Sequence, residues 1–367
     1  MMQLEFRPYC RPFQPPLQTA HGRWPQREGL ILRLVDESGQ VRFGEIAPIP
    51  WFGTETLAQA SDFCHQWPAQ FKAEQILTIP NTLPACQFGF AAGLRVASHE
   101  PVSSPRGNKR VEALESRLKI ASRSPGIGNA QPSPQALPYQ RQDLSAEPLA
   151  PVDVCGLLPT GQAALNAWST LWERGHRTFK WKIGVAAVET ELALFQQLVT
   201  ALPEPSRLRL DANGGLTSAA AATWLTACDA AAGKVEFLEQ PLPPDRSLAW
   251  LSTAVHNFKT AIALDESVAT VHQLEQVYQR LGSAVVYIVK PAIAGFPQQL
   301  LDFCRRHPLD VVISSALETP IGRHAALQLA QQLWALGMPQ RALGLGVSQW
   351  FADDWDTLSE AALWESL

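Results

Sequence analysis

The sequence predicts an α/β fold, a closed (β/α) barrel, preceded by a smaller N-terminal α+β domain. From about residue 150 onward, apolar strand-like runs alternate with helix-like stretches, and this alternation is typical of a parallel sheet. Polar residues end five of these runs at intervals of roughly 25 to 30 residues, about the length of one strand, one helix and their turns. In a barrel such strand ends form one ring, where active sites are built.

The N-terminal domain, expected over residues 1–97, has a different pattern. Two apolar runs, 30–35 and 41–46, flank an Asp-Glu-Ser-Gly turn and predict a β-hairpin. A helix is expected through residues 57–63, with Thr54 as its N-cap. Strands followed by helices indicate a small α+β unit.

Residues 98–136 interrupt this organisation. They are rich in Ser, Pro, Gly and Asn, a composition that favours an exposed, flexible insertion near the domain boundary. Their several Lys and Arg residues leave a basic docking patch as an alternative, but a tolerated insertion is the favoured interpretation. The barrel is expected over 137–346, and 347–367 as a C-terminal segment that packs back on the N-terminal domain.

The barrel elements follow in order. A first strand is expected at 152–157, and a helix at 162–173, where apolar residues recur at helical spacing. Further strands are predicted at 178–183, 207–211, 235–239, 261–265, 285–290 and 311–315. Alanine-rich helical stretches such as 217–232 separate them, and 343–346 is the candidate for the eighth strand.

Bulk properties exclude several classes of protein. The net charge of −4 and pI of about 6.1 give no basic stripe for nucleic acid. No apolar run reaches the ~18 residues of a membrane-spanning helix, and no secretory signal is evident. The six cysteines lack the paired spacing of a disulfide framework or zinc site, which favours a cytoplasmic protein. The oligomeric state stays open.

The run 179–183 carries two lysines on one face. Because side chains alternate along a strand, the apolar residues of this run point one way and Lys180 and Lys182 the other. An edge strand with solvated lysines is the alternative, but a barrel strand is covered on both faces. Both lysines are therefore expected to point into the barrel.

Three acids, Asp211, Glu239 and Asp265, end successive apolar runs. One such acid alone would more often be a helix cap. Three in succession favour a site for Mg²⁺, which prefers hard oxygen ligands. Lys290 ends the next run, and a lysine buried there needs a partner or a function. Two lysines across a divalent ion suit proton abstraction beside a carboxylate.

The motifs FKWKIG, LRLDANGG, EFLEQPL, ALDES and VYIVKP together resemble the enolase superfamily, in its muconate-lactonizing subgroup. The sequence GEIAP near residue 45 resembles that superfamily's N-terminal capping domain. Within the superfamily, SSALET at 314–319 and WFG after GEIAP resemble o-succinylbenzoate synthases of menaquinone and phylloquinone biosynthesis. The resemblance implies a lyase that dehydrates 2-succinyl-6-hydroxy-2,4-cyclohexadiene-1-carboxylate to o-succinylbenzoate.

The resemblance also implies roles for the polar residues. Asp211, Glu239 and Asp265 would bind Mg²⁺, for which Mn²⁺ could substitute. Lys182 would take the proton beside the ring carboxylate, giving an enediolate stabilised by Mg²⁺, and then protonate the departing hydroxyl from the same face. Lys290 would stay cationic and stabilise the intermediate.

Further contacts to the substrate, a small carboxylate, are implied with less support. Lys180 would support the carboxylate and tune Lys182, and Asn213 would hold the metal shell or substrate. Ser314 and Ser315 would contact the succinyl end, although serines at strand ends are often only caps.

A loop around residues 19–27 would close over the site, as lids do when they exclude water. Within it, His21 and Arg23 are candidates to meet a substrate carboxylate. Ordinary exposed loop residues are an equally good interpretation of both.

Two alternatives to the synthase remain. An N-acylamino acid racemase or dipeptide epimerase of the same subgroup would use the same two lysines. Epimerases usually carry an acidic DxD-type motif late in the barrel, where this chain has Gly344-Leu345-Gly346-Val347. A non-catalytic barrel would be expected to lose a ligand or a lysine, and all five positions are intact.

Overall fold

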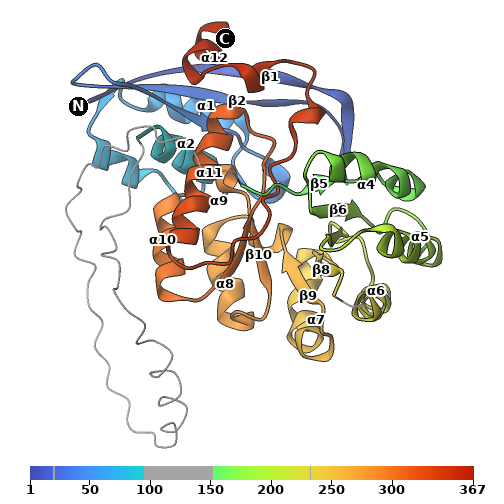
Figure 1. Ribbon diagram of the computed structural model, residues 1–367. Coiled ribbons are helices and arrows are strands. Elements are labelled where there is room, and N and C mark those ends of the chain that lie inside the picture. Colours follow the sequence, from blue (N-terminus) through green and yellow to red (C-terminus); the bar gives the residue numbers. More distant parts are fainter. Residues whose placement is uncertain (20, 95–151, 232) are drawn as a thin grey trace, which may run out of the picture. The chain divides into compact units, whose positions relative to one another are not determined.

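Two sheets organise the protein (Figure 1). The computed structural model describes residues 1–19, 21–94, 152–231 and 233–367, and these fall within one unit. One sheet has four strands in the order β3-β2-β1-β4, and the other has seven in the order β11-β10-β9-β8-β7-β6-β5. The predicted insertion at 98–136 lies outside the described residues.

The four-stranded sheet belongs to the N-terminal part of the chain. Its strands are β1 (Met2–Thr19), β2 (Gly22–Asp36), β3 (Val41–Ile46) and β4 (Gln70–Phe71). β2 and β3 pair antiparallel from Leu30 with Ile46 to Val35 with Val41. The predicted hairpin is therefore confirmed in register.

No strand was predicted where β1 lies, and its Pro8, Pro12, Pro15 and Pro16 are unusual in a strand. β4 pairs only with Met2 and Gln3, so most of β1 has one edge without a sheet partner among the described strands. Proline lacks an N–H and is tolerated at such an edge.

The predicted loop at 19–27 is wrong in its local structure. Thr19 pairs with Gly22 and Arg11 with Arg27, so residues 22–27 are the start of β2. This segment and the end of β1 form the tip of a long two-stranded ribbon, called the hairpin tip below.

Helix α1 (Leu57–Gln66) occupies the predicted position, but its N-cap is Thr56 and not Thr54. The Thr56 hydroxyl accepts a hydrogen bond from the Gln59 N–H at 3.2 Å, and the Gln59 side chain accepts one from the Thr56 N–H. This reciprocal capping box fixes the start of the helix. The Thr54 hydroxyl instead accepts from the Ile49 N–H.

The second N-terminal helix joins the two parts of the unit. α2 (Pro84–Leu94) is apolar around its whole circumference and is buried along nearly all its length. It packs against β2 and β3 on one side and against α9 (Pro291–Ala294) on another. Such a helix belongs in an interior.

The parallel sheet confirms the predicted barrel strands. They are β5 (Gly156–Leu157), β6 (Thr178–Lys182), β7 (Arg207–Asp211), β8 (Val235–Glu239), β9 (Ala261–Leu264), β10 (Val286–Val289) and β11 (Asp310–Ile313). The predicted eighth strand is present only as bridges, from Leu343 to Val154 and from Gly344 to Ser314. These bridges join the two ends of the curled sheet.

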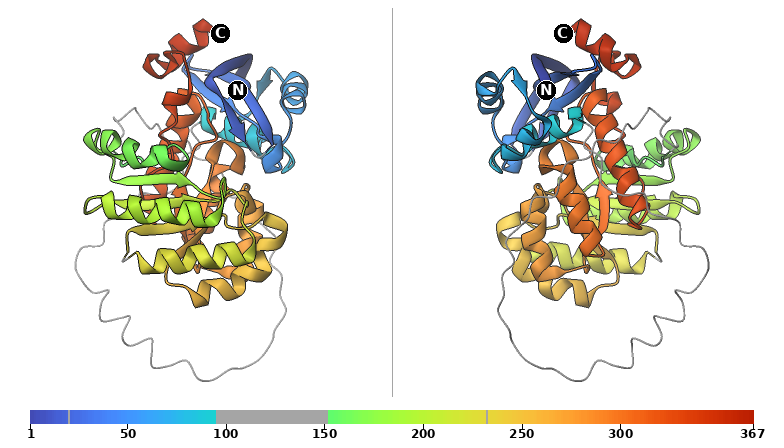
Figure 2. Two further views of the ribbon diagram at one scale, coloured as in Figure 1. Left: turned by 90° about the vertical axis from the view of Figure 1, so that its right-hand side faces the viewer. Right: turned by 90° about the vertical axis from the view of Figure 1, so that its left-hand side faces the viewer.

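Helices cover the outer face of this sheet (Figure 2). They are α4 (Ala164–Glu173), α5 (Val188–Ala201), α6 (Ser218–Ala230), α7 (Pro244–Asn257), α8 (Val271–Leu281), α10 (Pro297–Arg306) and α11 (Pro320–Ala335). The largest apolar cluster lies between helices and strands, and a smaller one around Phe237 and Ile288 fills the barrel interior. Both faces of the strands are thus buried, as parallel sheets require.

The chain ends beside its beginning, and both termini lie at the same end of the molecule in Figure 2. α12 (Glu360–Ser366) places Leu363 and Trp364 in one apolar cluster with Tyr9 of β1 and Ile31 of β2. The Arg7 guanidinium lies 4.3 Å from the Trp364 ring centroid and donates to the Trp364 carbonyl.

Candidate active site at the carboxyl ends of the strands

A cavity of about 580 Å³ lies at the carboxyl ends of the barrel strands. Its volume suits a small organic ligand. The lining includes most of the predicted site residues, namely Lys180, Lys182, Asp211, Asn213, Glu239, Asp265, Lys290, Ser314 and Ser315. The three carboxylates and three lysines of this set are called the polar ring below.

Strand β6 aims its two lysines inward as predicted. Phe179, Trp181 and Ile183 are fully buried in the outer core, so Lys180 and Lys182 face the cavity. The Lys180 ammonium lies 2.8 Å from Asp211 Oδ2 and 2.8 Å from Glu239 Oε1. Lys182 makes no side-chain hydrogen bond or ion pair with any other described residue, so its amine is free to meet a ligand.

The last lysine of the polar ring faces this pair. Lys290 follows β10, and its ammonium forms an ion pair with Asp265. β6 and β10 stand four places apart in the strand order, half-way around a ring of eight. The Lys290 ammonium also lies 4.6 Å from the centroid of Phe52, an N-terminal residue.

Asn213 holds Asp211 in place. Its backbone N–H donates to Asp211 Oδ1 at 2.9 Å, and its side-chain amide donates to Asp211 Oδ2 and to Glu266 Oε1, each at 3.2 Å. Asn213 has a positive φ of 43°, which Asn tolerates better than most residues.

Electrostatics in the ring reflect crowded negative charge. Burial and the charges of Asp211 and Asp265 raise the pKa of Glu239 to about 8. Burial also opposes ionisation of Asp211, but the charge and hydrogen bond of Lys180 outweigh it and lower the pKa of Asp211. Burial works against the Lys180 ammonium too, yet Asp211 and Glu239 raise the pKa of Lys180 well above its usual value.

This donor set fits a divalent cation. Three buried carboxylates share one cavity, and a cation would relieve the repulsion that, together with burial, raises the pKa of Glu239. The neighbouring Glu266 has a buried carboxylate oxygen without a hydrogen-bond partner. Among the described residues, no three acids converge closely enough to hold one ion as they stand. Metal binding would exchange their present contacts with Lys180 and Lys290 for contacts with the ion.

The hairpin tip reaches the cavity through the end of β1 and not through the predicted substrate contacts His21 and Arg23. Leu17, Gln18 and Thr19 line it, whereas His21 and Arg23 are exposed and are not among its lining residues. The His21 ring stacks on Trp51 at 5.7 Å between centroids. No local pattern in residues 17–19 marks them as cavity residues; what brings them there is the pairing of β1 with β2.

The segment after β11 was predicted to meet the substrate, and it carries Ser314 and Ser315 in the cavity wall. Ser315 Oγ donates to Glu318 Oε2 at 3.0 Å and accepts from the Leu317 N–H at 2.8 Å. Leu317, at a positive φ of 60°, also lines the cavity.

Two buried charged residues of the N-terminal part hold this segment. Glu45 accepts hydrogen bonds from the Thr319 N–H at 2.9 Å and the Gly322 N–H at 3.0 Å, at the start of α11. Arg27 donates to the Ala316 carbonyl at 3.1 Å. Both residues lie near predicted motifs, but their partners are more than 250 residues away in sequence and gave no local signal.

Comparison with protein families places both parts of the chain. Residues 163–357 match the family described as enolase C-terminal domain-like, and residues 1–97 match the N-terminal domain of MenC. Together the two matches cover the hairpin tip and the whole polar ring.

Individual relatives agree with these matches. The o-succinylbenzoate synthase of Thermosynechococcus vestitus is 39% identical over 371 residues, covering 100% of this chain and 99% of the relative. The crystal structure of o-succinylbenzoate synthase from Thermosynechococcus elongatus, with Mg in the active site, superposes with a TM-score of 0.80 at 37% identity and covers 100% of both chains.

A more distant structure shares the fold alone. The L-Ala-D/L-Glu epimerase of Bacillus subtilis has a TM-score of 0.67 at 18% identity and covers 96% of this chain and 91% of its own. The full-length identity to a synthase, with the match of the N-terminal domain, shows the family: the chain belongs to the o-succinylbenzoate synthase family of the enolase superfamily.

Proposed function

We propose that this chain is an o-succinylbenzoate synthase, a carbon–oxygen lyase of menaquinone or phylloquinone biosynthesis. It dehydrates 2-succinyl-6-hydroxy-2,4-cyclohexadiene-1-carboxylate. The observation that carries the proposal is the placement of Lys182 and Lys290 on opposite sides of one cavity that also holds three carboxylates.

We assign the binding of Mg²⁺, or Mn²⁺ in its place, to Asp211, Glu239 and Asp265. When bound, the ion supplies positive charge beside the substrate carboxylate, which makes the neighbouring C–H more acidic. Asn213 orients Asp211 through two hydrogen bonds, and such support of a ligand tunes metal affinity.

The lysines carry the proton chemistry. Lys182, without an ion-pair partner among the described residues, removes the proton beside the ring carboxylate and then returns it to the departing hydroxyl from the same face. Lys290 remains an ammonium opposite it and stabilises the negative charge that develops. We also assign to Lys290 a cation–π contact with the substrate ring as that ring becomes aromatic. Lys180, whose ammonium lies beside Asp211 and Glu239, supports the substrate carboxylate and tunes Lys182.

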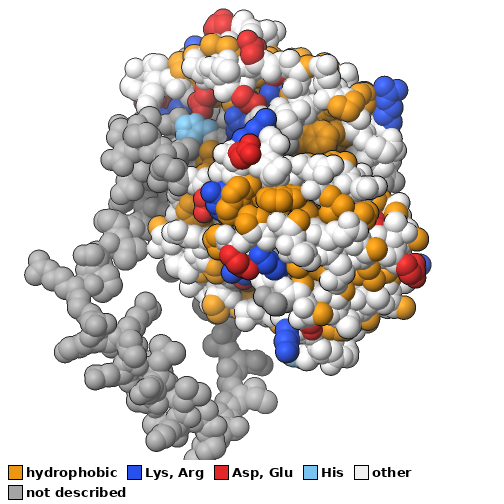
Figure 3. All heavy atoms as spheres, turned by 45° about the vertical axis from the view of Figure 1, so that its right-hand side comes forward, with side chains coloured by type: hydrophobic (Ala, Val, Ile, Leu, Met, Phe, Trp, Pro, Cys, Tyr) orange, Lys and Arg blue, Asp and Glu red, His pale blue; other side chains and the backbone are white. Residues whose placement is uncertain are grey.

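The partner is accordingly a small carboxylate. We assign Ser314 and Ser315 to its succinyl end, and keep His21 and Arg23 as candidates for a carboxylate that enters past the hairpin tip. On the face shown in Figure 3, basic and acidic side chains are interspersed, which supports a small ligand over nucleic acid.

The cytoplasm is the proposed compartment, because all six cysteines are free. Among the described residues, no helix is long and apolar enough to cross a membrane.

The test is to incubate the purified protein with Mg²⁺ and the cyclohexadiene substrate and to follow the loss of diene absorbance. Turnover that EDTA abolishes and Mg²⁺ restores is the expected result. Exchange of the α-proton of N-acylamino acids in D₂O without dehydration would transfer the assignment to a racemase. Failure of both reactions, with no Mg²⁺ bound, would exclude the enzyme assignments.

A further inference from the structure

Two segments from opposite ends of the chain form part of the cavity wall, and neither belongs to a barrel strand. One is the end of β1, residues 16–19, and the other carries Val347 and Trp350 around the 3-10 helix η5 (Ser348–Trp350). We call these two segments the mouth of the cavity. A bridge between Phe13 and Phe351 joins them, with ring centroids 5.0 Å apart.

A buried arginine underlies this junction. Arg11 of β1 is 1% exposed and binds Asp353 with two nitrogens, Nε at 2.9 Å and Nη2 at 2.8 Å. The same guanidinium lies 3.7 Å from the Phe351 ring centroid and 3.4 Å from Asp356 Oδ2. Removing any one of these partners would leave a charge poorly compensated in the interior.

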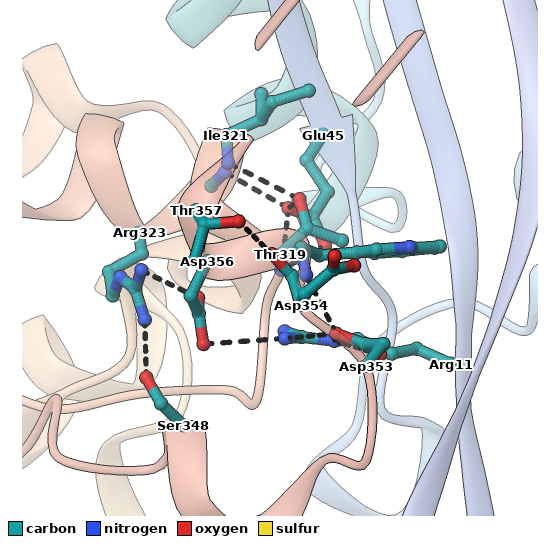
Figure 4. Close-up of polar contacts among 12 residues, drawn as sticks. Arg11, Glu45, Thr319, Ile321, Arg323, Ser348, Asp353, Asp354, Asp356 and Thr357 are labelled. Atoms are coloured by element: carbon teal, nitrogen blue, oxygen red, sulfur yellow. Dashed lines mark hydrogen bonds and ion pairs between the residues drawn. The ribbon is translucent and has the colours of Figure 1, made fainter. Parts of the chain in front are cut away.

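A second arginine ties the same segment to the barrel. Arg323 of α11 donates to Ser348 Oγ at 2.8 Å and pairs with Asp356 Oδ1 at 2.6 Å. Figure 4 shows Asp356 between the two guanidinium groups, with Ser348 at one end of the chain of contacts and Asp353 at the other. We call Arg11, Arg323, Ser348, Asp353 and Asp356 the clasp.

The clasp therefore links three parts of the protein: strand β1, helix α11 and the C-terminal segment that begins with η5. A displacement of η5 breaks the contact of Arg323 with Ser348, and a displacement of β1 breaks the paired bonds of Arg11 with Asp353. Buried ion pairs add little net stability compared with apolar packing, because desolvation offsets their attraction. Unlike an apolar contact, however, these ion pairs hold the segments at fixed distances and orientations.

We propose that the clasp determines substrate specificity by setting the distance between the two walls of the mouth. Arg11 and Arg323 are positioning residues: they act through Leu17, Val347 and Trp350 on the part of the substrate that lies away from the lysines. The proposal depends on the proposed function in one respect: it takes this part of the substrate to be the succinyl arm.

The first test compares two matched variants. Arg323→Gln removes the guanidinium group and its positive charge from the clasp. Arg341→Gln is the control and removes a guanidinium group at the opposite end of the barrel. There Arg341 binds Asp310 through Nε at 2.7 Å and Nη2 at 2.6 Å. The two side chains are 21% and 25% exposed, so both variants are expected to fold. Arg323→Gln should raise KM about 10-fold and change kcat less than about twofold, because small displacements of binding groups have large effects.

The control variant, Arg341→Gln, should lower the melting temperature about as much as Arg323→Gln does, but it should leave KM unchanged. Arg323→Lys, which keeps the charge, should restore part of the lost affinity. Equal effects of Arg323→Gln and Arg341→Gln on KM would show that the clasp acts only through stability and would overturn the proposal.

Hydrogen exchange gives a readout that does not require turnover. Arg323→Gln should speed amide exchange in residues 345–351 and also at the hairpin tip, which Arg323 does not touch. Exchange that changes only near η5 would overturn the coupling. An inactive wild-type protein would refute the synthase assignment, whereas the exchange result would still decide whether the clasp couples the two walls.

Discussion

The polar ring and the mouth of the cavity are built in opposite ways. Each member of the ring except Lys180, which lies within β6, stands at the end of a barrel strand. The positions follow from the register of neighbouring strands, such as Lys182 with Asp211 and Asp211 with Glu239. The mouth depends on contacts such as that of Arg11 with Asp353, across 342 residues. The position of the polar ring therefore follows from local periodicity, and the position of the mouth from the docking of distant segments.

The largest expected effect falls on the ring. Lys182→Ala should lower kcat at least about 10³-fold with little change in stability, because the proposed base and acid is one group. Loss of diene absorbance measures it. Lys234→Ala is a suitable control, since that lysine pairs with Glu204 and the Leu202 carbonyl outside the cavity. Retained activity in Lys182→Ala would remove the lysine from the mechanism.

An ionic network at the base of the barrel predicts a pH-dependent stability. Glu236 lies 2.7 Å from Arg209 and also pairs with Arg341. Burial opposes its ionisation, but the two arginines outweigh it and lower the pKa of Glu236 below its ordinary 4.5. The stabilisation is thus present above pH 4.5 and lost as the pH falls through the folded-state pKa.

Glu236→Gln should accordingly lower the free energy of unfolding by about 3 kcal/mol at neutral pH, because Arg209 is left buried. Urea unfolding between pH 3 and pH 8 would measure it. The difference from wild type should shrink on acidification, and a difference independent of pH would show that packing alone is responsible.

A smaller effect, on the affinity for Mg²⁺, is expected from Asn213, which supports Asp211 of the polar ring. Asn213→Gly keeps the positive φ but removes the side-chain amide that holds Asp211 and Glu266. Affinity for Mg²⁺ should fall roughly 10- to 100-fold, as for other residues that support a metal ligand. Calorimetric titration with Mg²⁺ measures this without substrate, and unchanged affinity would leave Asn213 a purely structural turn residue.

The smallest effect should come from the mouth. Leu17→Ala removes apolar surface from the hairpin tip and should raise KM about fivefold, equivalent to ~1 kcal/mol, with kcat unchanged. Steady-state kinetics separate the two constants. A fall in kcat of the same size would mean that the mouth takes part in the chemical step and that the contrast with the ring is false.

The sequence predicted the ring because each of its signals is contained in a few neighbouring residues. Alternation in β6 oriented both lysines, and apolar runs ended by a polar residue marked β7, β8 and β10. The eighth strand had only a weak signal in the sequence. In the structure Leu343 and Gly344 form only isolated bridges, so there is no long apolar run to recognise.

What the sequence could not provide were elements that distant partners stabilise. β1 contains prolines that local rules assign to turns, and it forms a strand because β2 pairs with it along most of its length. The wrong N-cap, Thr54, is a different case, because the capping box of Thr56 with Gln59 spans only four residues and was a local signal. The importance of Glu45 and Arg11 became visible only with their partners in place.

The separation of Arg11 from Asp353 also constrains how the protein is made. At about 5–20 residues per second, the ribosome adds Asp353 roughly 20 to 70 s after Arg11. The ribbon of β1 and β2 emerges first, yet the Arg11 guanidinium cannot bind Asp353 until 342 further residues have been added. A nascent chain can therefore pair the strands that carry the polar ring before the contact between Arg11 and Asp353 can form.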